Sequence, residues 1–168
     1  DVGARFYTFT STLHYVMEAC AENDIPLLVL DRPNPNGGFV DGPILEMENS
    51  SFIGMHPIPV VYGLTIGELA KMINGEGWLA NNNQCDLTVI PCSYYYHGRT
   101  YILPVSPSPN LPNSHAVLLY PSTCFFEGTV ISEGRGTVSP FEVFGHPDLK
   151  GDYSYTPVSI EGMSKYPK

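Results

Sequence analysis

The sequence predicts an α/β fold in which helices alternate with the strands of a parallel sheet. A helical pattern over residues 11–24 leads into a continuous apolar run at 25–30, and a second helical pattern over 65–75 precedes another run at 86–90. A helix followed by a short, continuous apolar strand is the repeating unit of a parallel sheet, whose strands are covered on both faces. We therefore expect two parallel, buried strands.

The first predicted helix has one apolar face. The residues that recur on it at helical spacing are Leu13, Val16, Met17 and Cys20. Ser11 or Thr12 is expected to cap the helix at its start, and Asn23 and Asp24 are expected to end it.

A rigid polar turn, residues 31–38, follows the first strand and contains two prolines and two glycines. In open α/β sheets, ligands bind beyond the carboxyl ends of the strands. Asp31, Arg32 and Asn34 are therefore candidate binding residues. The alternative is that Asp31 and Asn34 form Asx turns that only hold the loop. Gly37 and its neighbour do not form a dinucleotide-binding fingerprint, since no G-x-G-x-x-G opens a helix there.

The next segment, residues 39–64, is irregular and is expected to be a long functional loop that crosses the end of the sheet. His56 lies in its proline-rich centre without a second histidine or a nucleophile nearby, which favours a structural role. Thr65 and Glu68 have the T-x-x-E spacing of a capping box. The helix that they start is expected to direct three side chains inward, those of Leu69, Met72 and Ile73.

Aromatic residues gather after the second strand, at Tyr94, Tyr95, Tyr96 and Tyr101, with Trp78 nearby in the sequence. They can stack on a sugar ring or a base, or they can be ordinary surface and core residues. Residues 104–112 are a proline-rich connector, where we expect a domain boundary. Asn113 is expected to cap a helix that Pro121 stops, and residues 124–126 are expected to form a strand.

The most distinctive stretch is 125–144, within which residues 132–137 read Ser-Glu-Gly-Arg-Gly-Thr. The glycines are expected to take positive φ and to leave space around Glu133. Glu133 and Arg135 point the same way if this segment is extended, and could hold a polar ligand. Glycoside hydrolysis uses two carboxyl groups, and Glu127 is the second candidate. A charged neighbour at Arg135 would keep Glu133 ionised, which suits a base or a binding role. The alternative is a surface ion pair of little consequence.

Composition restricts the possible functions. The chain has 168 residues, 43% hydrophobic and 15% charged, which indicates a globular protein. Its net charge of −9 argues against binding to nucleic acid. Four unclustered cysteines, five scattered histidines and the lack of a G-x-S-x-G sequence give no support for a metal site, a cofactor or a serine nucleophile elbow. No run of 18 apolar residues is present. Because the chain begins with Asp rather than Met, we expect it to be an internal part of a longer protein.

Several segments together resemble one family, the NamZ-type exo-β-N-acetylmuramidases. The segments are LDRPNPNGG (30–38), HPIPVVYGLTIGELA (56–70), SPSPN (106–110), YPSTCFFEGTVISEGRGT (120–137) and PFEVFG (140–145). The resemblance covers nearly all of residues 1–150. It implies a glycoside hydrolase that releases terminal N-acetylmuramic acid from the non-reducing end of peptidoglycan fragments, exported to the periplasm or beyond, in cell-wall turnover.

The resemblance also implies a fold and a set of site residues. Residues 1–104 would be the C-terminal portion of a Rossmann-like domain, and residues 105–168 the start of a smaller α+β C-terminal domain. Glu133 and Glu127 are the expected catalytic carboxyls. The positions expected to bind substrate are Asp1, Arg5, Asp31, Arg32, Asn34, Tyr62 and Arg135. The segments 94–97 and 113–115 depart from the family pattern, which leaves substrate preference open there.

One part of the substrate suggests a role for arginine. N-acetylmuramic acid carries a lactyl carboxylate, for which a bidentate guanidinium from Arg32 or Arg135 is a natural partner. Two other functions stay open from the sequence: a non-catalytic module that binds cell-wall sugars or peptides, and an acyl or amide hydrolase that acts on the cell wall.

Overall fold

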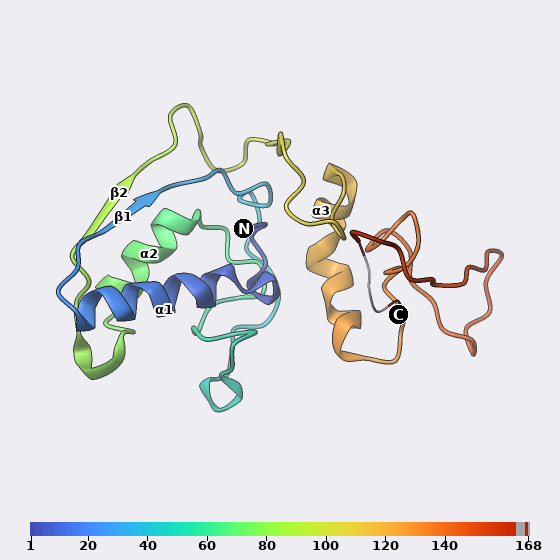
Figure 1. Cartoon of the computed structure of the whole chain (residues 1–168), viewed down its shortest axis with the longest axis horizontal. Coiled ribbons are helices and arrows are strands. Elements are labelled where there is room, and N and C mark those ends of the chain that lie inside the picture. Colours follow the sequence, from blue (N-terminus) through green and yellow to red (C-terminus); the bar gives the residue numbers. More distant parts are fainter. Residues whose placement is uncertain (164–166, 168) are drawn as a thin grey trace. The chain divides into compact units, whose positions relative to one another are not determined.

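The computed structural model describes residues 1–163 and residue 167 (Figure 1). It divides into two compact units, Asp1–Tyr101 and Ile102–Lys168. The domain boundary that the sequence places at residue 104 stays a prediction for the whole protein.

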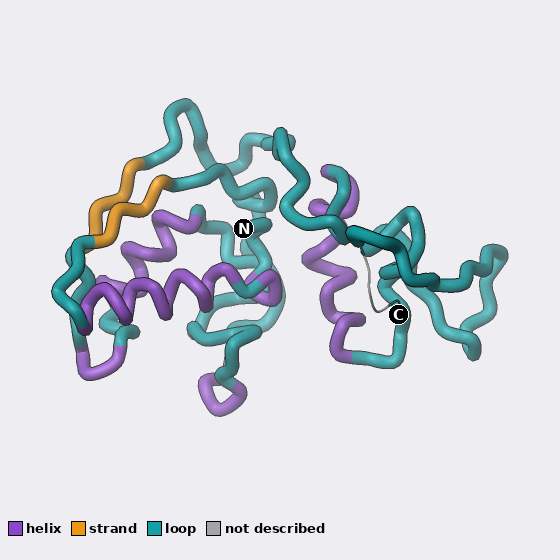
Figure 2. Tube along the Cα trace, viewed as in Figure 1, coloured by secondary structure: helices purple, strands orange, loops and turns teal. Residues whose placement is uncertain are grey.

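The first unit is built around two parallel strands, β1 (Leu27–Leu30) and β2 (Leu87–Ile90), shown in orange in Figure 2. They pair in register from Leu27 opposite Leu87 to Leu30 opposite Ile90. The α/β class and the parallel sheet that the sequence predicts are confirmed, in keeping with a Rossmann-like fold.

Two helices, α1 (Phe9–Glu22) and α2 (Ile66–Gly75), lie on the same side of the strands (Figure 1). Their buried side chains form a core with residues of the long loop and of the segment between α2 and β2. The buried core residues are Met17, Ile58, Tyr62, Leu69, Ala70, Ile73, Leu79 and Cys85. Met72 packs against this core and is partly buried. The inward face predicted for α2 is therefore confirmed.

The strands are not buried on both faces, and that expectation was wrong. Leu28 and Leu30 are 56% and 66% exposed, while the alternate positions Leu27 and Val29 pack against the core. Successive side chains of a strand point to opposite faces. Within the described residues, the helices cover only one of these faces.

The two helix starts differ in how well the sequence predicts them. The capping box of α2 is confirmed, because Thr65 Oγ1 accepts from Glu68 N at 3.2 Å and Glu68 Oε2 accepts from Thr65 N at 2.8 Å. Helix α1 instead begins at Phe9, directly after the short 3-10 helix η1 (Arg5–Tyr7) and a left-handed Thr8. Ser11 and Thr12 therefore lie inside its first turn and do not cap it.

The predicted apolar face of α1 is correct in part. Met17 is fully buried, but Val16 is 44% exposed. Two further single-turn 3-10 helices complete the first unit, η2 (Met47–Asn49) and η3 (Ala80–Asn82). Trp78 stacks on His56, with ring centroids 5.1 Å apart, rather than joining the tyrosines.

The second unit contains helix α3 (Ser114–Thr123), which Asn113 caps as predicted by accepting from Ala116 N at 2.9 Å. Pro121 does not stop this helix. It lies in the last turn, where the chain tightens into the 3-10 helix η4 (Cys124–Gly128), and so the strand expected at 124–126 was wrong. Tyr120 and Phe141 pack edge to face in the core of this unit, with ring centroids 5.1 Å apart.

Candidate functional site

A pocket of about 410 Å³ lies beyond the carboxyl ends of β1 and β2, and we call it the strand-end pocket. Its lining comes from the residues that follow each strand: Asp31, Arg32, Pro33, Cys92, Ser93, Tyr94, Tyr95, Arg99 and Tyr101. This is the position at which open α/β sheets bind ligands. The structure thus brings Asp31 and Arg32 together with the predicted aromatic residues.

Asp31 is held by the protein itself. Its Oδ2 accepts from Thr65 Oγ1 at 2.6 Å, and its Oδ1 accepts from Gly67 N at 2.8 Å and from Arg32 N at 2.8 Å. A carboxylate at the start of a helix is favoured by the unpaired N–H groups there. Asp31 therefore ties the end of β1 to the start of α2 and positions the pocket.

Arg32 and Arg99 are the cationic groups of the strand-end pocket, and both are exposed. Arg99 Nη1 donates to the carbonyl of Tyr94 at 3.0 Å, and Tyr94 is 92% exposed. Guanidinium groups bind carboxylates in a planar fork, and aromatic faces stack on sugar rings. The pocket is suited to a ring-bearing anion. Sequence reasoning missed Arg99, although the rule that selects residues after β1 also applies after β2.

His97 fixes the loop that carries these aromatics. Its Nε2 lies 2.9 Å from Glu68 Oε1 and its Nδ1 lies 3.2 Å from the carbonyl oxygen of Gly37. Both partners are acceptors, so both ring nitrogens donate when the imidazole is charged. The hydrogen bond to Glu68 raises the pKa of His97 above its usual value. The charged form therefore fastens loop 93–99 to α2 and to the turn after β1.

Asn34 makes structural contacts, which are one of the two alternatives that the sequence leaves open for it. It is buried, its Nδ2 donates to the carbonyl of Leu64 at 2.9 Å, and its Oδ1 accepts from Asn36 N at 2.8 Å. The second contact is the Asx turn expected for this loop. The carbonyl of Asn34 also accepts from the hydroxyl of Tyr95 at 3.0 Å, which positions a wall of the strand-end pocket.

Asp1 and Tyr62, 61 residues apart, contact each other. The Tyr62 hydroxyl donates to Asp1 Oδ1 at 2.7 Å, and the same oxygen accepts from Gly3 N at 2.7 Å. Tyr62 is 5% exposed, and burial raises the pKa of its hydroxyl. These contacts tie residues 1–3 to the long loop.

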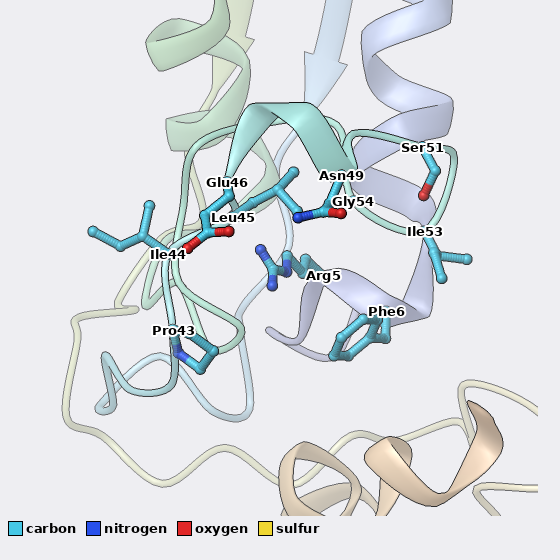
Figure 3. Close-up of a pocket in the computed structure, with 10 residues that line it drawn as sticks. All are labelled: Arg5, Phe6, Pro43, Ile44, Leu45, Glu46, Asn49, Ser51, Ile53 and Gly54. Atoms are coloured by element: carbon cyan, nitrogen blue, oxygen red, sulfur yellow. The ribbon is translucent and has the colours of Figure 1, made fainter. Parts of the chain in front are cut away.

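Arg5 lies in a different pocket of the first unit, of about 340 Å³, which we call the Arg5 pocket. Figure 3 shows its lining: Arg5, Phe6, Pro43, Ile44, Leu45, Glu46, Asn49, Ser51, Ile53 and Gly54. Arg5 is 6% exposed, and its Nη1 donates to the carbonyl of Ile58 at 3.1 Å. The long loop expected to be functional therefore encloses a pocket with a buried cation in it.

In the second unit, Arg135 contacts both predicted catalytic carboxylates. Its Nη2 donates to Glu127 Oε2 at 2.5 Å, and its Nε lies 3.3 Å from Glu133 Oε1. The Tyr120 hydroxyl donates to Glu127 Oε1 at 3.2 Å, and the Arg135 guanidinium lies over the ring of Phe141 at 5.3 Å. The structure brings together the three charged residues that the sequence singles out.

The surroundings of Glu133 differ from those expected. Glu133 is completely buried, whereas the side chains of Glu127 and Arg135 are about a third exposed. Gly134 and Gly136 do take positive φ, 84° and 82°, as predicted. They do not open space, however, because a Cβ on Gly134 would lie 2.8 Å from Ser139 O, and one on Gly136 would lie 2.5 Å from Val158 O. The glycines are required by close packing.

Metal binding finds no support in the described residues. Across residues 1–163 and 167, no three His, Cys, Asp or Glu side chains group so as to hold a metal ion. Over the same residues, no helix combines the length and the apolar character that crossing a membrane needs.

A family model described as exo-beta-N-acetylmuramidase NamZ, N-terminal, matches residues 1–115. The chain belongs to the NamZ family. The model for the C-terminal part of the same family matches residues 118–164. The resemblance stated from the sequence motifs is thereby confirmed.

Relatives of the chain include a protein named as a NamZ muramidase and two solved structures. The peptidoglycan beta-N-acetylmuramidase NamZ of Bacillus subtilis (strain 168) is 50% identical over 155 residues, which are 89% of this chain and 36% of that protein. A DUF1343 family protein from Bacteroides fragilis NCTC 9343 has a TM-score of 0.96 and 57% identity, over 99% of this chain and 47% of its own.

A second DUF1343 family protein from the same organism has a TM-score of 0.83 and 36% identity, over 89% of this chain and 40% of its own. This chain thus spans between about a third and a half of the length of these relatives. At these identities, the likeness supports the family assignment as well as the fold.

Proposed function

We propose that this NamZ-family protein is a glycoside hydrolase that releases terminal N-acetylmuramic acid from the non-reducing end of peptidoglycan fragments. The observation that carries the proposal is the 50% identity to the peptidoglycan beta-N-acetylmuramidase of Bacillus subtilis, together with family matches over both parts of the chain. Cell-wall turnover outside the cytoplasm is the physiological role that we assign to it, since peptidoglycan lies there.

The strand-end pocket supports this substrate class in the first unit. Arg32 and Arg99 offer two guanidinium groups for the lactyl carboxylate of the muramic acid, and Tyr94 offers an exposed ring face for the sugar. These two guanidinium groups place positive charge at the pocket, although the chain as a whole is negatively charged. In the proposal, Asp31 and Asn34 position this pocket rather than contact the sugar.

The glutamates of the second unit support the reaction. Hydrolysis of a glycoside needs a carboxyl group that donates a proton and a carboxylate that acts as base or nucleophile. Glu127 is the more exposed of the two candidates, and so we propose it as one of the two carboxyl groups that take part in the reaction. Glu133, buried against Arg135, holds the guanidinium that in turn orients Glu127.

The test is release of nitrophenol from para-nitrophenyl β-N-acetylmuramide by the full-length protein. Wild type is expected to release it, whereas Glu127→Gln, which keeps the shape and removes the charge, is expected to lose at least about a hundredfold in kcat/KM. Glu133→Gln is expected to lose less activity than Glu127→Gln. Added salt should not restore the activity of either variant. The matched control, Glu161→Gln, changes an exposed glutamate in the same unit and should retain full activity.

The same assay decides between catalysis and simple binding. One observation favours a binding module: the only carboxylate among the residues lining the strand-end pocket, that of Asp31, is already occupied by hydrogen bonds within the protein. Binding of N-acetylmuramic acid by the full-length wild type without any release of nitrophenol would establish that alternative and reject the hydrolase.

A further inference from the structure

The Arg5 pocket combines a buried cation with an anionic rim. Arg5 is 6% exposed, and its Cζ lies 5.3 Å from the centre of the Phe6 ring. Glu46 is exposed and lines the same pocket. In Figure 3 the Glu46 carboxylate and the Asn49 amide end on the guanidinium side of the pocket. A ligand that enters therefore meets a positive floor and a negative rim.

The backbone around Arg5 holds this floor in place. Arg5 N donates to the carbonyl of Val60 at 2.9 Å, and Leu45 N donates to the carbonyl of Ile58 at 3.2 Å. A tight turn joins Ser51 and Gly54 through two backbone hydrogen bonds of 2.9 and 3.0 Å. The loop that forms the rim is thus tied to the segment that fixes the guanidinium, which preorganises the pocket.

Most of the remaining lining of the pocket is apolar. Ile44 and Ile53 are 61% and 56% exposed although both are aliphatic, and they flank the partly buried Leu45. Exposed aliphatic side chains that gather around a pocket commonly mark a binding site. A volume of about 340 Å³ is within the range of pockets for small molecules.

We propose that the Arg5 pocket binds an amino acid or a dipeptide with an aliphatic side chain, in zwitterionic form. The carboxylate pairs with the Arg5 guanidinium, the ammonium group faces Glu46, and the side chain lies against Ile44 and Ile53. A simple anion would place its charge near Glu46 without compensation, whereas a zwitterion satisfies both charges. This site is separate from the sugar-binding residues of the strand-end pocket, and its existence does not depend on the proposed hydrolase activity.

The ligand test uses a matched series with the full-length protein in isothermal titration calorimetry. Leucine and alanyl-leucine carry both charges, leucinamide lacks the carboxylate, and 4-methylpentanoate lacks the ammonium group. Leucine or alanyl-leucine is expected to bind at least about tenfold more tightly than leucinamide, since a charge-assisted hydrogen bond to Arg5 is lost. If leucinamide binds as tightly as leucine, or if neither zwitterion binds at about 10 mM, the proposal is wrong.

Two variants test the location. A Cβ on Gly54 would lie 3.5 Å from Leu45 Cδ2 and 3.8 Å from Arg5 Cδ, so Gly54→Val fills the floor of the pocket without a clash at Cβ. It is expected to weaken binding of leucine about tenfold or more. Gly75→Val, placed where a Cβ would meet nothing within 4 Å, is the matched control and should bind as wild type does.

The second variant, Glu46→Gln, removes an exposed charge and is expected to leave the fold intact. It is expected to weaken binding of leucine and to leave binding of 4-methylpentanoate unchanged or stronger. Unchanged binding of leucine by both Gly54→Val and Glu46→Gln would place the site elsewhere and overturn the proposal. Release of nitrophenol from the muramide, measured in parallel, reports on the hydrolase proposal alone.

Discussion

The buried pair of His14 and His56 predicts a loss of stability in mildly acidic solution. His14 Nδ1 lies 3.0 Å from His56 Nε2, and the His56 ring also stacks on Trp78. His56 is 1% exposed; burial, reinforced by His14, lowers the pKa of its imidazole from 6.5 to about 4. Burial also lowers the pKa of His14, against the opposing effect of Glu18. The folded state therefore favours the neutral form of His56.

The magnitude follows from the difference in proton binding between the folded and unfolded states. With a pKa of 6.5 when unfolded and about 4 when folded, His56 contributes stability that is fully present above about pH 6.5. This contribution falls as the pH decreases toward 4. Between about pH 7 and about pH 5, the free energy of unfolding is expected to fall by about 2 kcal/mol from this residue alone.

The assay is urea denaturation at these two pH values, followed by the fluorescence of Trp78. Trp78 is the single tryptophan of the chain and touches His56, so its signal reports on the first unit. The control is His56→Gln, which keeps a hydrogen-bonding partner for His14 but does not titrate. An equal loss of stability in wild type and in His56→Gln between the two pH values would refute the assignment to His56.

Three further predictions concern packing and the strand-end pocket. Gly67→Ala should lower the free energy of unfolding, because its Cβ would lie 2.6 Å from Val89 Cγ1; crowding costs ~1–3 kcal/mol, more than the gain of up to about 1 kcal/mol in helix propensity. In calorimetry, Gly134→Ala should destabilise by about 2 kcal/mol, since φ is 84° and Ser139 O is too close, whereas Gly128→Ala should be neutral. Because the pKa of His97 is raised, the charged imidazole that holds loop 93–99 is the form present at the lower pH. Amide exchange of that loop, corrected for intrinsic rates, should therefore rise from about pH 6 to about pH 9 in wild type and show no such step in His97→Gln. The same step in both proteins would exclude His97 as the clamp.

Local patterns predict local structure well in this chain. Thr65 and Glu68 are three residues apart, so the capping box can be read directly from the sequence and is present as predicted. The same holds for the cap at Asn113. Arg135 and Glu133 are also close in the sequence, and their contact could be anticipated.

Long-range packing accounts for what sequence reasoning missed. The partner of His56 is His14, 42 residues earlier, and the residues next to His56 in the sequence do not indicate this contact. The sequence predicts that Gly134 leaves space, whereas folding brings Ser139 and Val143 against it. A continuous apolar run such as residues 27–30 predicts a strand, but it does not predict whether other elements cover each face of that strand.

The bonds of Asp31 have a consequence for evolution within the family. A charged residue in a predicted binding turn, such as Asp31, would be a natural choice when catalytic residues are sought among invariant positions. Its carboxylate, however, is committed to Thr65 and to the backbone of Gly67. We expect these three positions to co-vary across homologues, so that Asp31 is replaced only where Thr65 or Gly67 is replaced as well. Invariance at Asp31 would then reflect selection for the contact between the end of β1 and the start of α2, and not selection for catalysis.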